Sequence, residues 1–566
     1  MNRKKSATRR RQGPSQGPRG AFRSLALGSR QSGNPHFATP STASPHRLAA
    51  KTTVLSRRTA SALALLAFTS VLRADFVTGR VVDSNGVGVP GININAFRVS
   101  NGNEEKNIFN DGTDGAGNFT TTIPAGVYDL HFIPPQPPAT THVPLVVRNV
   151  VIAGTKNLGT LTLQAGWILS GHLQRQSGTP LNGVNVQLTD MITGFDVPQA
   201  QLKSDAFGNF SLASPRNAIR LRLIASTNVV PFVASKELLL TPSADTNLGN
   251  VTLADGFTVS GHVQRADTAG SVQGVNLDFF NATTGVKLFT PNDSSNTLGD
   301  FATIVPAGTY DIEFCAPFAT HLVALSLNRT VSGALNLGNV ALEPGFVMTG
   351  TIRNSSGVAQ VNADVDVRLQ GFGKLVTCGD NTNASGVYSV IVPAGVLKVI
   401  FHPANYNLGL GSKVVNPVAV SANLTLDAVL PNCASPVNYG VGLAGAGGIV
   451  PHLTTSGGVP AVDNPNFAFE LQSGRGGANA FLTVGVAQAA IPVLGGTLLV
   501  SPSTSVRLAT TLGGTPGVAG AGSRHFPIPV LASLVGVELF AQYFAQDPAA
   551  PQGWSFSEGV RFRVCR

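Results

Sequence analysis

The chain has 566 residues, far too many for one hydrophobic core, and ordinary domain sizes predict roughly three to five domains. Hydrophobic residues make up 43% and charged residues 12%, with 63 Gly, 36 Pro and three Met, which is typical of short strands joined by tight turns rather than of helices. The net charge of +10 would favour a nucleic-acid ligand, but 13 of the 39 basic residues lie in residues 1–58 and Arg73 is another. From Asp75 on, the chain carries 25 basic and 29 acidic residues, so we expect no nucleic-acid partner.

Residues 1–58 form a basic leader, rich in Arg, Ser, Pro and Gly, that we expect to be disordered. The 14 residues from Thr59 to Leu72 form an apolar run ahead of Arg73-Ala74. Such a run is typical of a signal peptide and is too short for a transmembrane helix, which needs about 20 apolar residues. We therefore predict a signal peptide over residues 59–74, cleavage after Ala74, and no transmembrane anchor in the mature chain. The alternatives are a buried helix for the run and an RNA-binding arm for the leader.

The chain from Asp75 to residue 432 contains four similar copies of one sequence pattern. Each copy opens on a glycine between strand-forming residues, and these glycines are 92, 90 and 89 residues apart: Gly79, Gly171, Gly261 and Gly350. We name the four predicted domains modules 1 to 4, with bounds 75–166, 167–256, 257–345 and 346–432. The remaining residues, 433–566, form a predicted fifth domain.

A turn of the form Asp/Asn-x-x-Gly-x-aromatic precedes a strand in the modules: Asp114–Phe119, Asp205–Phe210 and Asn383–Tyr388. In module 3 the stretch Thr297–Phe301 is expected to depart from the pattern at its first position. Glycine supplies the positive φ of such a turn, and the Asx side chain accepts hydrogen bonds from nearby backbone N–H groups. The functional alternative is a calcium site at Asp111–Asp114, but the spacing is not that of an EF-hand and no bidentate Glu follows. We therefore expect a turn and no metal ion.

An Ile/Val-Pro-Ala-Gly turn follows, at Pro124, Pro306 and Pro393 and in a degenerate form at Pro215. The strand after this turn alternates between apolar and polar residues. In module 1, Tyr128, Leu130 and Phe132 face one way, and Asp129 and His131 face the other. This period predicts a strand with one face on a core and the other in water. The water-facing positions change in charge from module to module: Arg220 and Arg222, then Asp311 and Glu313, then Lys398 and Ile400. Four copies of one charged ligand site are therefore excluded.

These openings, Asx turns and Pro-Ala-Gly turns resemble the carboxypeptidase regulatory-like domain of the transthyretin-like and Cna-B-like group, over Asp75–Asn432. The resemblance implies that each module is an Ig-like Greek-key β-sandwich of about seven strands, a carbohydrate-binding-like fold. It does not by itself imply sugar binding. Some Cna-B-like relatives contain an internal Lys–Asn isopeptide bond, but the chain offers no residues onto which that bond can be carried.

Residues 433–566 lack the repeat and are rich in Gly, Ala and Pro. Apolar runs between turn signals predict short strands and a jelly-roll-like β-sandwich: Phe467–Leu471, Ala480–Val486, Thr497–Val500, Val506–Leu508, Phe526–Val530, Val537–Tyr543 and Gly559–Val564. Gly495–Pro502, with Gln542 and Asp547-Pro548, resembles a C-terminal module of exported bacterial proteins of unassigned role. The predicted fold class of the whole chain is all-β.

The four cysteines are expected to meet an oxidising compartment after export. Cys433 and Cys565 bracket the fifth domain, and we predict that they form a disulfide. Cys315 and Cys378 belong to modules 3 and 4. For these two we expect buried thiols, with a disulfide as the alternative.

The motifs of common catalytic sites are missing from the sequence: H-E-x-x-H, G-x-S-x-G, a Walker loop and C-x-x-C. Two G-x-G-x-x-G matches, which begin at Gly86 and Gly440, do not open a helix of a βαβ unit, and chance explains them. His172 and His262 occupy the same position in successive modules, where we expect a surface or interface role. We therefore predict no catalytic residue, no cofactor, no metal ligand and no enzymatic activity.

The function predicted from these features is that of a secreted or cell-surface structural or adhesive protein. The modules would act as spacers, and the fifth domain would contact an envelope component, either a polysaccharide or another surface protein. The alternative is an extracellular carbohydrate-binding protein, which needs exposed aromatic platforms. The chain has two Trp and six Tyr, and Trp167 aligns with Phe257 and Phe346 at module starts, which favours packing. An accessory segment of an enzyme is a third class.

Overall fold

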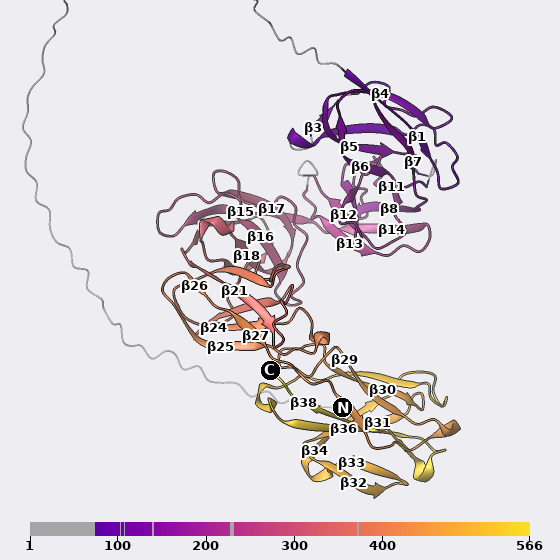
Figure 1. The fold of residues 1–566 in the computed structure, drawn as a ribbon, viewed down its shortest axis with the longest axis vertical. Coiled ribbons are helices and arrows are strands. Elements are labelled where there is room, and N and C mark those ends of the chain that lie inside the picture. The colour runs from indigo at the N-terminus through magenta and orange to yellow at the C-terminus, as the bar shows by residue number, and fades with distance from the viewer. Residues whose placement is uncertain (1–73, 102–103, 107, 138–140, 227–230, 371–372) are drawn as a thin grey trace, which may run out of the picture. The chain divides into compact units, whose positions relative to one another are not determined.

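The structure is a computed structural model that describes residues 74–566, with gaps at 102–103, 107, 138–140, 227–230 and 371–372 (Figure 1). The predicted leader and the predicted signal peptide up to Arg73 lie outside the described residues. The described chain consists of β-strands joined by turns, with 3-10 helices of three residues as its only helices. The fold class is therefore all-β. No helix in this part of the chain has the length and apolar character needed to cross a membrane.

Module 1 consists of two sheets, with strand orders β4-β1-β7 and β3-β2-β5-β6. The strand β1 pairs antiparallel with β4 and parallel with β7, so the first and last strands of the module lie side by side. The bounds are β1 (Ala74–Val82), β2 (Asn93–Arg98), β3 (Glu104–Lys106), β4 (Asn118–Pro124), β5 (Gly126–Ile133), β6 (Leu145–Ile152) and β7 (Lys156–Thr162).

Modules 2 to 4 repeat this arrangement, again with a parallel pairing of the opening and closing strands. Module 2 contains β8 (Trp167–Arg175), β9 (Asn185–Asp190), β10 (Asp196–Val197), β11 (Asn209–Ser214), β12 (Ile219–Ile224), β13 (Lys236–Leu240) and β14 (Thr246–Leu253). Module 3 contains β15 (Gly256–Arg265), β16 (Asn276–Asn281), β17 (Asp300–Pro306), β18 (Gly308–Cys315), β19 (Leu325–Val331) and β20 (Leu335–Leu342). Module 4 contains β21 (Phe346–Asn354), β22 (Asp364–Leu369), β23 (Val387–Val392), β24 (Gly395–His402), β25 (Lys413–Val420), β26 (Leu424–Thr425) and β27 (Ala428–Leu430).

The apolar face of the alternating strand forms the centre of each core. In module 1, Tyr128, Leu130 and Phe132 of β5 are fully buried against Ile92 and Ile94. The corresponding residues of β12, β18 and β24 are buried in separate clusters of modules 2, 3 and 4. Each module therefore has a core of its own. Burial of each such side chain contributes about 1.5–3 kcal/mol to the stability of its module.

The Asx turn has the same geometry in all four modules. Asp114 Oδ1 accepts hydrogen bonds from the N–H groups of Ala116 (2.9 Å) and Asn118 (2.8 Å), and Gly117 has a φ of +82°. The expectation that module 3 departs from the pattern is wrong. Asn296 holds the first position there and accepts hydrogen bonds from the N–H groups of Leu298 and Asp300, because the motif begins one residue before Thr297.

The fifth domain contains a sheet of order β28-β38-β36-β31-β34, to which β37 adds on β36, a sheet β29-β30-β35 and a hairpin β32-β33. Each of the seven predicted strands overlaps an observed one, whereas β28, β29, β32 and β37 were not predicted. The bounds are β28 (Val437–Tyr439), β29 (His452–Ser456), β30 (Ala468–Gly474), β31 (Asn479–Gly485), β32 (Gln488–Val493), β33 (Gly496–Val500), β34 (Ser505–Thr511), β35 (Gly522–Pro527), β36 (Glu538–Gln546), β37 (Trp554–Phe556) and β38 (Gly559–Arg563).

Candidate functional site

The faces that the alternating strands turn away from the cores are only partly exposed to water. Asp129 of β5 is 9% exposed. Its carboxylate lies 3.1 Å from the guanidinium of Arg148 and accepts a hydrogen bond of 2.8 Å from the N–H group of Asn149. In module 4, Ile400 is 3% exposed. The prediction of a water-facing side is therefore wrong at Asp129 and Ile400. At Asp129 the reason is that residues of the neighbouring strand β6 reach over the carboxylate.

A loop that follows the second strand of each later module contacts the outward side of the module before it. The guanidinium of Arg148 on β6 lies 3.9 Å from the ring centre of Phe195 in module 2. The guanidinium of Arg222 on β12 lies 5.2 Å from the ring centre of Phe289 in module 3. A cation over an aromatic face contributes about 0.5–2 kcal/mol, so each contact favours a defined junction.

The junction between modules 3 and 4 is covalent. Cys315, the last residue of β18, forms a disulfide with Cys378, in the loop between β22 and β23, and their Cα atoms are 5.9 Å apart. The expectation of two buried thiols is wrong. It rested on the placement of the two cysteines in different modules, but the loop of module 4 comes back to the end of the module 3 strand.

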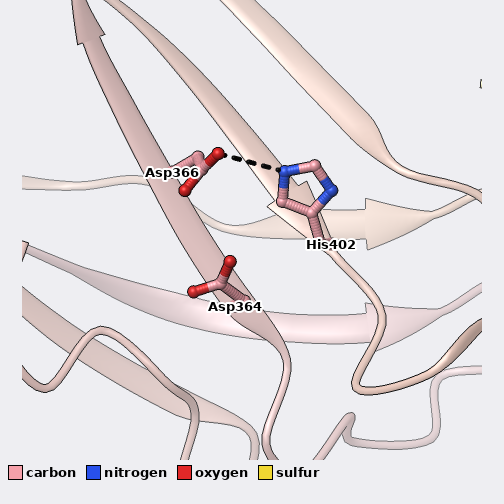
Figure 2. Close-up of side chains that lie close together, drawn as sticks. All are labelled: Asp364, Asp366 and His402. Carbon is pink, nitrogen blue, oxygen red and sulfur yellow. Dashed lines mark ion pairs between the residues drawn. The ribbon is translucent and has the colours of Figure 1, made fainter. Parts of the chain in front are cut away.

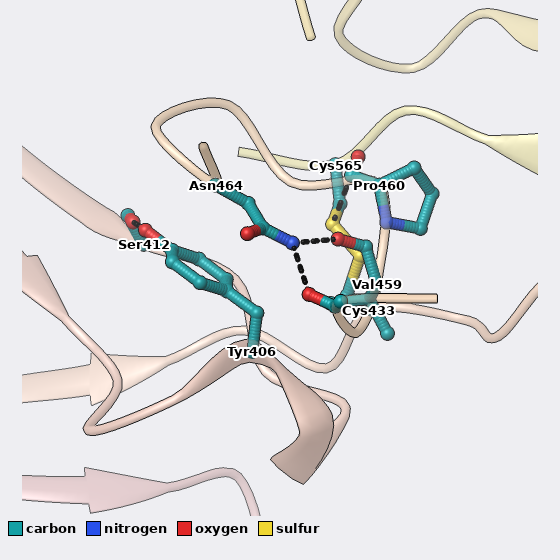
Figure 3. The surroundings of a disulfide bond; sticks show 8 residues. Tyr406, Ser412, Cys433, Val459, Pro460, Asn464 and Cys565 are labelled. Carbon is teal, nitrogen blue, oxygen red and sulfur yellow. Dashed lines mark hydrogen bonds between the residues drawn. A yellow bond between two sulfur atoms is a disulfide. The ribbon is translucent and has the colours of Figure 1, made fainter. Parts of the chain in front are cut away.

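The second disulfide joins Cys433 to Cys565 and closes a loop across the fifth domain, with a sequence separation of 132 (Figure 3). The bridge lies in a small apolar cluster with Val459, Ala461 and Tyr406 of module 4. The N–H group of Cys433 donates to Gly409 O (2.8 Å). The bridge thus joins the two ends of the fifth domain and packs them against the loop between β24 and β25 of module 4.

A cluster of titratable side chains lies on β22 and β24 of module 4 (Figure 2). Asp366 Oδ1 is 2.5 Å from Lys374 Nζ, and Asp366 Oδ2 is 3.5 Å from His402 Nε2. Asp364 is the third member, two residues before Asp366 on β22. The other ring nitrogen of His402, Nδ1, lies 2.9 Å from Ser412 Oγ.

This cluster has the ligand types of a metal site and the Asp-His-Ser order of a catalytic triad, but its contacts favour a structural role. Lys374 already supplies the cation that neutralises Asp366. Ser412 is 1% exposed, and its hydroxyl also lies 3.1 Å from Tyr406 Oη, so a substrate carbonyl could not reach it. Sequence reasoning missed the cluster because its members are far apart in the chain and match no motif.

Asp366 gives the cluster a pH-dependent effect on stability. Burial raises the pKa of Asp366, but the hydrogen bonds and charges of His402 and Lys374 outweigh burial and lower it to about 2. A carboxyl group with a lowered pKa stabilises the fold above its unfolded pKa of about 3.9, and this contribution disappears as the pH falls through 2. We expect Asp366→Asn to cost about 1–2 kcal/mol at pH 7 and almost nothing near pH 2.

Hydrogen exchange of the β22 and β24 amides, followed by mass spectrometry, measures this difference. Asp364→Asn is the matched control, since Lys374 and His402 form their ion pairs with Asp366. Equal exchange rates of the Asp366→Asn variant and the unchanged chain at pH 7 would contradict the assignment.

The other residues singled out in the sequence have structural contacts. His172 Nδ1 lies 3.2 Å from Asn209 Oδ1, and His262 Nδ1 lies 2.9 Å from Asp300 Oδ1, so both histidines contact the Asx turn. Asp547 of the fifth domain is 3% exposed and accepts the N–H group of Ala446 at 2.7 Å. The motif of the fifth domain that contains Asp547 therefore includes a buried hydrogen-bond acceptor that fixes a loop.

No family model and no curated protein matches the chain. Solved structures that resemble parts of it include the Bacillus anthracis TIE protein, with 11% identity over 63% of this chain and 68% of that one and a TM-score of 0.15. A mutant of the shaft pilin SpaA from Lactobacillus rhamnosus GG has 11% identity over 32% and 98%, with a TM-score of 0.17. A DUF3823 family protein from Bacteroides ovatus has 14% identity over 39% and 99%, with a TM-score of 0.13. TM-scores this low do not establish a shared fold. The assignment of the fold is therefore based on the strand pairing of this chain.

Proposed function

We propose that the protein is a non-enzymatic structural protein of the cell surface or extracellular space, whose modules form a stiffened spacer. The observation that carries the proposal is the Cys315–Cys378 disulfide, which links two successive modules covalently. The resemblance of the modules to carboxypeptidase regulatory-like domains, whose family model does not match the chain, is part of the same proposal.

Three features support a spacer. Contacts of the same kind recur at successive junctions, first between Arg148 and Phe195 and then between Arg222 and Phe289. The outward faces of modules 1 and 2 each contact a different loop of the next module, and the outward faces of the four modules share no ligand chemistry. The chain has two disulfides, and disulfides persist in oxidising compartments such as the extracellular space. This agrees with the prediction that the apolar run at residues 59–72 belongs to a signal peptide for export.

Single-molecule energy transfer tests the stiffening. Dyes attached through unnatural amino acids at the exposed Thr268 and Ser356 report the distance between modules 3 and 4. We expect one narrow distribution for the unchanged chain and a clearly broader one for the Cys315→Ser/Cys378→Ser variant. The Cys433→Ser/Cys565→Ser variant is the matched control and should keep the narrow distribution. A broad distribution in the unchanged chain would overturn the spacer proposal.

A further inference from the structure

A row of side chains crosses four strands on the outward face of the fifth domain. Thr511 of β34 pairs with Asn479 of β31, and Gln546 of β36 pairs with Trp554 of β37. Asn479 Nδ2 donates to Gln546 Oε1 at 3.2 Å and joins the two pairs. These four residues line one hollow of about 460 Å³. A hydroxyl, two amides and an indole therefore lie next to one another on one surface.

The aromatic side of this hollow is a supported platform. The Trp554 ring is half-buried, and its centre lies 6.0 Å from that of Phe481 and 5.9 Å from that of Phe544. Packing of this kind holds the indole in place before any ligand binds, so little side-chain entropy is lost on binding.

A second hollow of about 500 Å³ adjoins the first, because Asn479 and Gln546 line both. Gly476, Gly477 and Pro548 are on the wall of the second hollow, where short side chains leave the surface open. We call these two adjoining hollows together the groove. Two adjoining hollows suit a ligand with more than one unit.

The chemistry of the groove matches that of a sugar. A pyranose ring has an apolar C–H face that packs on an aromatic ring, and hydroxyls that both donate and accept, as primary amides do. Neither hollow has a carboxylate among its lining residues, so the groove lacks the pair of carboxyl groups needed to hydrolyse a glycosidic bond. The Arg475 guanidinium, on the wall of the second hollow, lies 3.6 Å from the buried Asp547 carboxylate, which neutralises it. The residues that line the two hollows therefore carry no unpaired charge, which favours a neutral ligand.

We propose that the groove beside Trp554, Asn479 and Gln546 binds a neutral glycan chain without cleaving it. This property belongs to the fifth domain and does not depend on stiff junctions between modules 3 and 4. The spacer and the glycan site can therefore fail separately.

The test measures binding of the full chain to an array of neutral glycans and, by affinity electrophoresis, to soluble neutral polysaccharides. We expect the unchanged chain to bind, and Trp554→Ala to lower the affinity by at least about tenfold. Because Trp554→Ala also removes packing, Thr511→Trp provides a second variant that blocks the groove from an exposed strand position and removes no core side chain. It should abolish binding as well.

Phe207→Ala is the matched control, since Phe207 is a 72% exposed aromatic residue on a turn of module 2. This variant should bind as the unchanged chain does. Three results would each overturn the proposal: the unchanged chain binds no neutral glycan, Thr511→Trp binds normally, or binding is confined to anionic glycans and disappears with added salt.

Discussion

Replacement of Cys433 and Cys565 by alanine is expected to lower the free energy of unfolding of the fifth domain by up to about 5 kcal/mol. The disulfide closes a loop with a sequence separation of 132, and the entropy that such a loop loses in the unfolded chain accounts for this magnitude. Cys433 is also 6% exposed in a small apolar cluster, so the loss of the bridge weakens packing against Tyr406. An effect this large is comparable to the whole stability of an ordinary domain.

The two tryptophans of the chain allow this loss to be assigned to one domain. Trp167→Phe removes the tryptophan of module 2 and introduces the residue that modules 3 and 4 have in the same place, at Phe257 and Phe346. Denaturant unfolding followed by fluorescence then reports Trp554 alone. Cys315→Ala/Cys378→Ala is the matched control and should leave this transition unchanged. An unfolding midpoint that is the same with and without the Cys433–Cys565 bridge would refute the prediction.

Local sequence patterns predicted the strands and turns well because the interactions that form them are local. The alternation Tyr128-Asp129-Leu130 correctly predicted which side chains enter the core, since a strand turns successive residues to opposite faces. The Asx turn at Asp114 was predicted for the same reason, because its acceptor and donors lie within four residues.

Contacts between distant residues were harder to predict. The outward position of Asp129 gave no sign that Arg148 would cover it, because strand order and register decide which neighbour reaches over a side chain. The cluster of Asp366 with His402 arises from the pairing of β22 with β24, and the Cys315–Cys378 bridge arises from a loop that crosses to another module. The groove in the fifth domain was missed because β37, which carries Trp554, was not predicted.

Gln542 links the β32-β33 hairpin to the main sheet of the fifth domain, and its replacement by leucine is expected to destabilise that domain by about 3–5 kcal/mol. The side chain is 0% exposed. Its Oε1 accepts the N–H group of Leu499 at 2.9 Å, and its Nε2 donates to Thr497 O at 3.0 Å and Ser557 O at 2.9 Å. Leucine would leave one buried donor and two carbonyl groups without these partners, at about 1–3 kcal/mol for each unsatisfied group before relaxation.

The same Trp554 fluorescence measurement in the Trp167→Phe background determines the cost of Gln542→Leu. Gln488→Leu is the matched control, because Gln488 is an exposed glutamine on β32 of the same hairpin, and its replacement should change stability by less than about 0.5 kcal/mol. Faster hydrogen exchange at the Leu499 amide should accompany the loss in Gln542→Leu. If the two variants instead unfold at the same denaturant concentration, the buried amide of Gln542 does not anchor the motif around Gly495–Pro502. The hairpin is then held by the apolar contacts of Leu498 with Phe544 and Phe556.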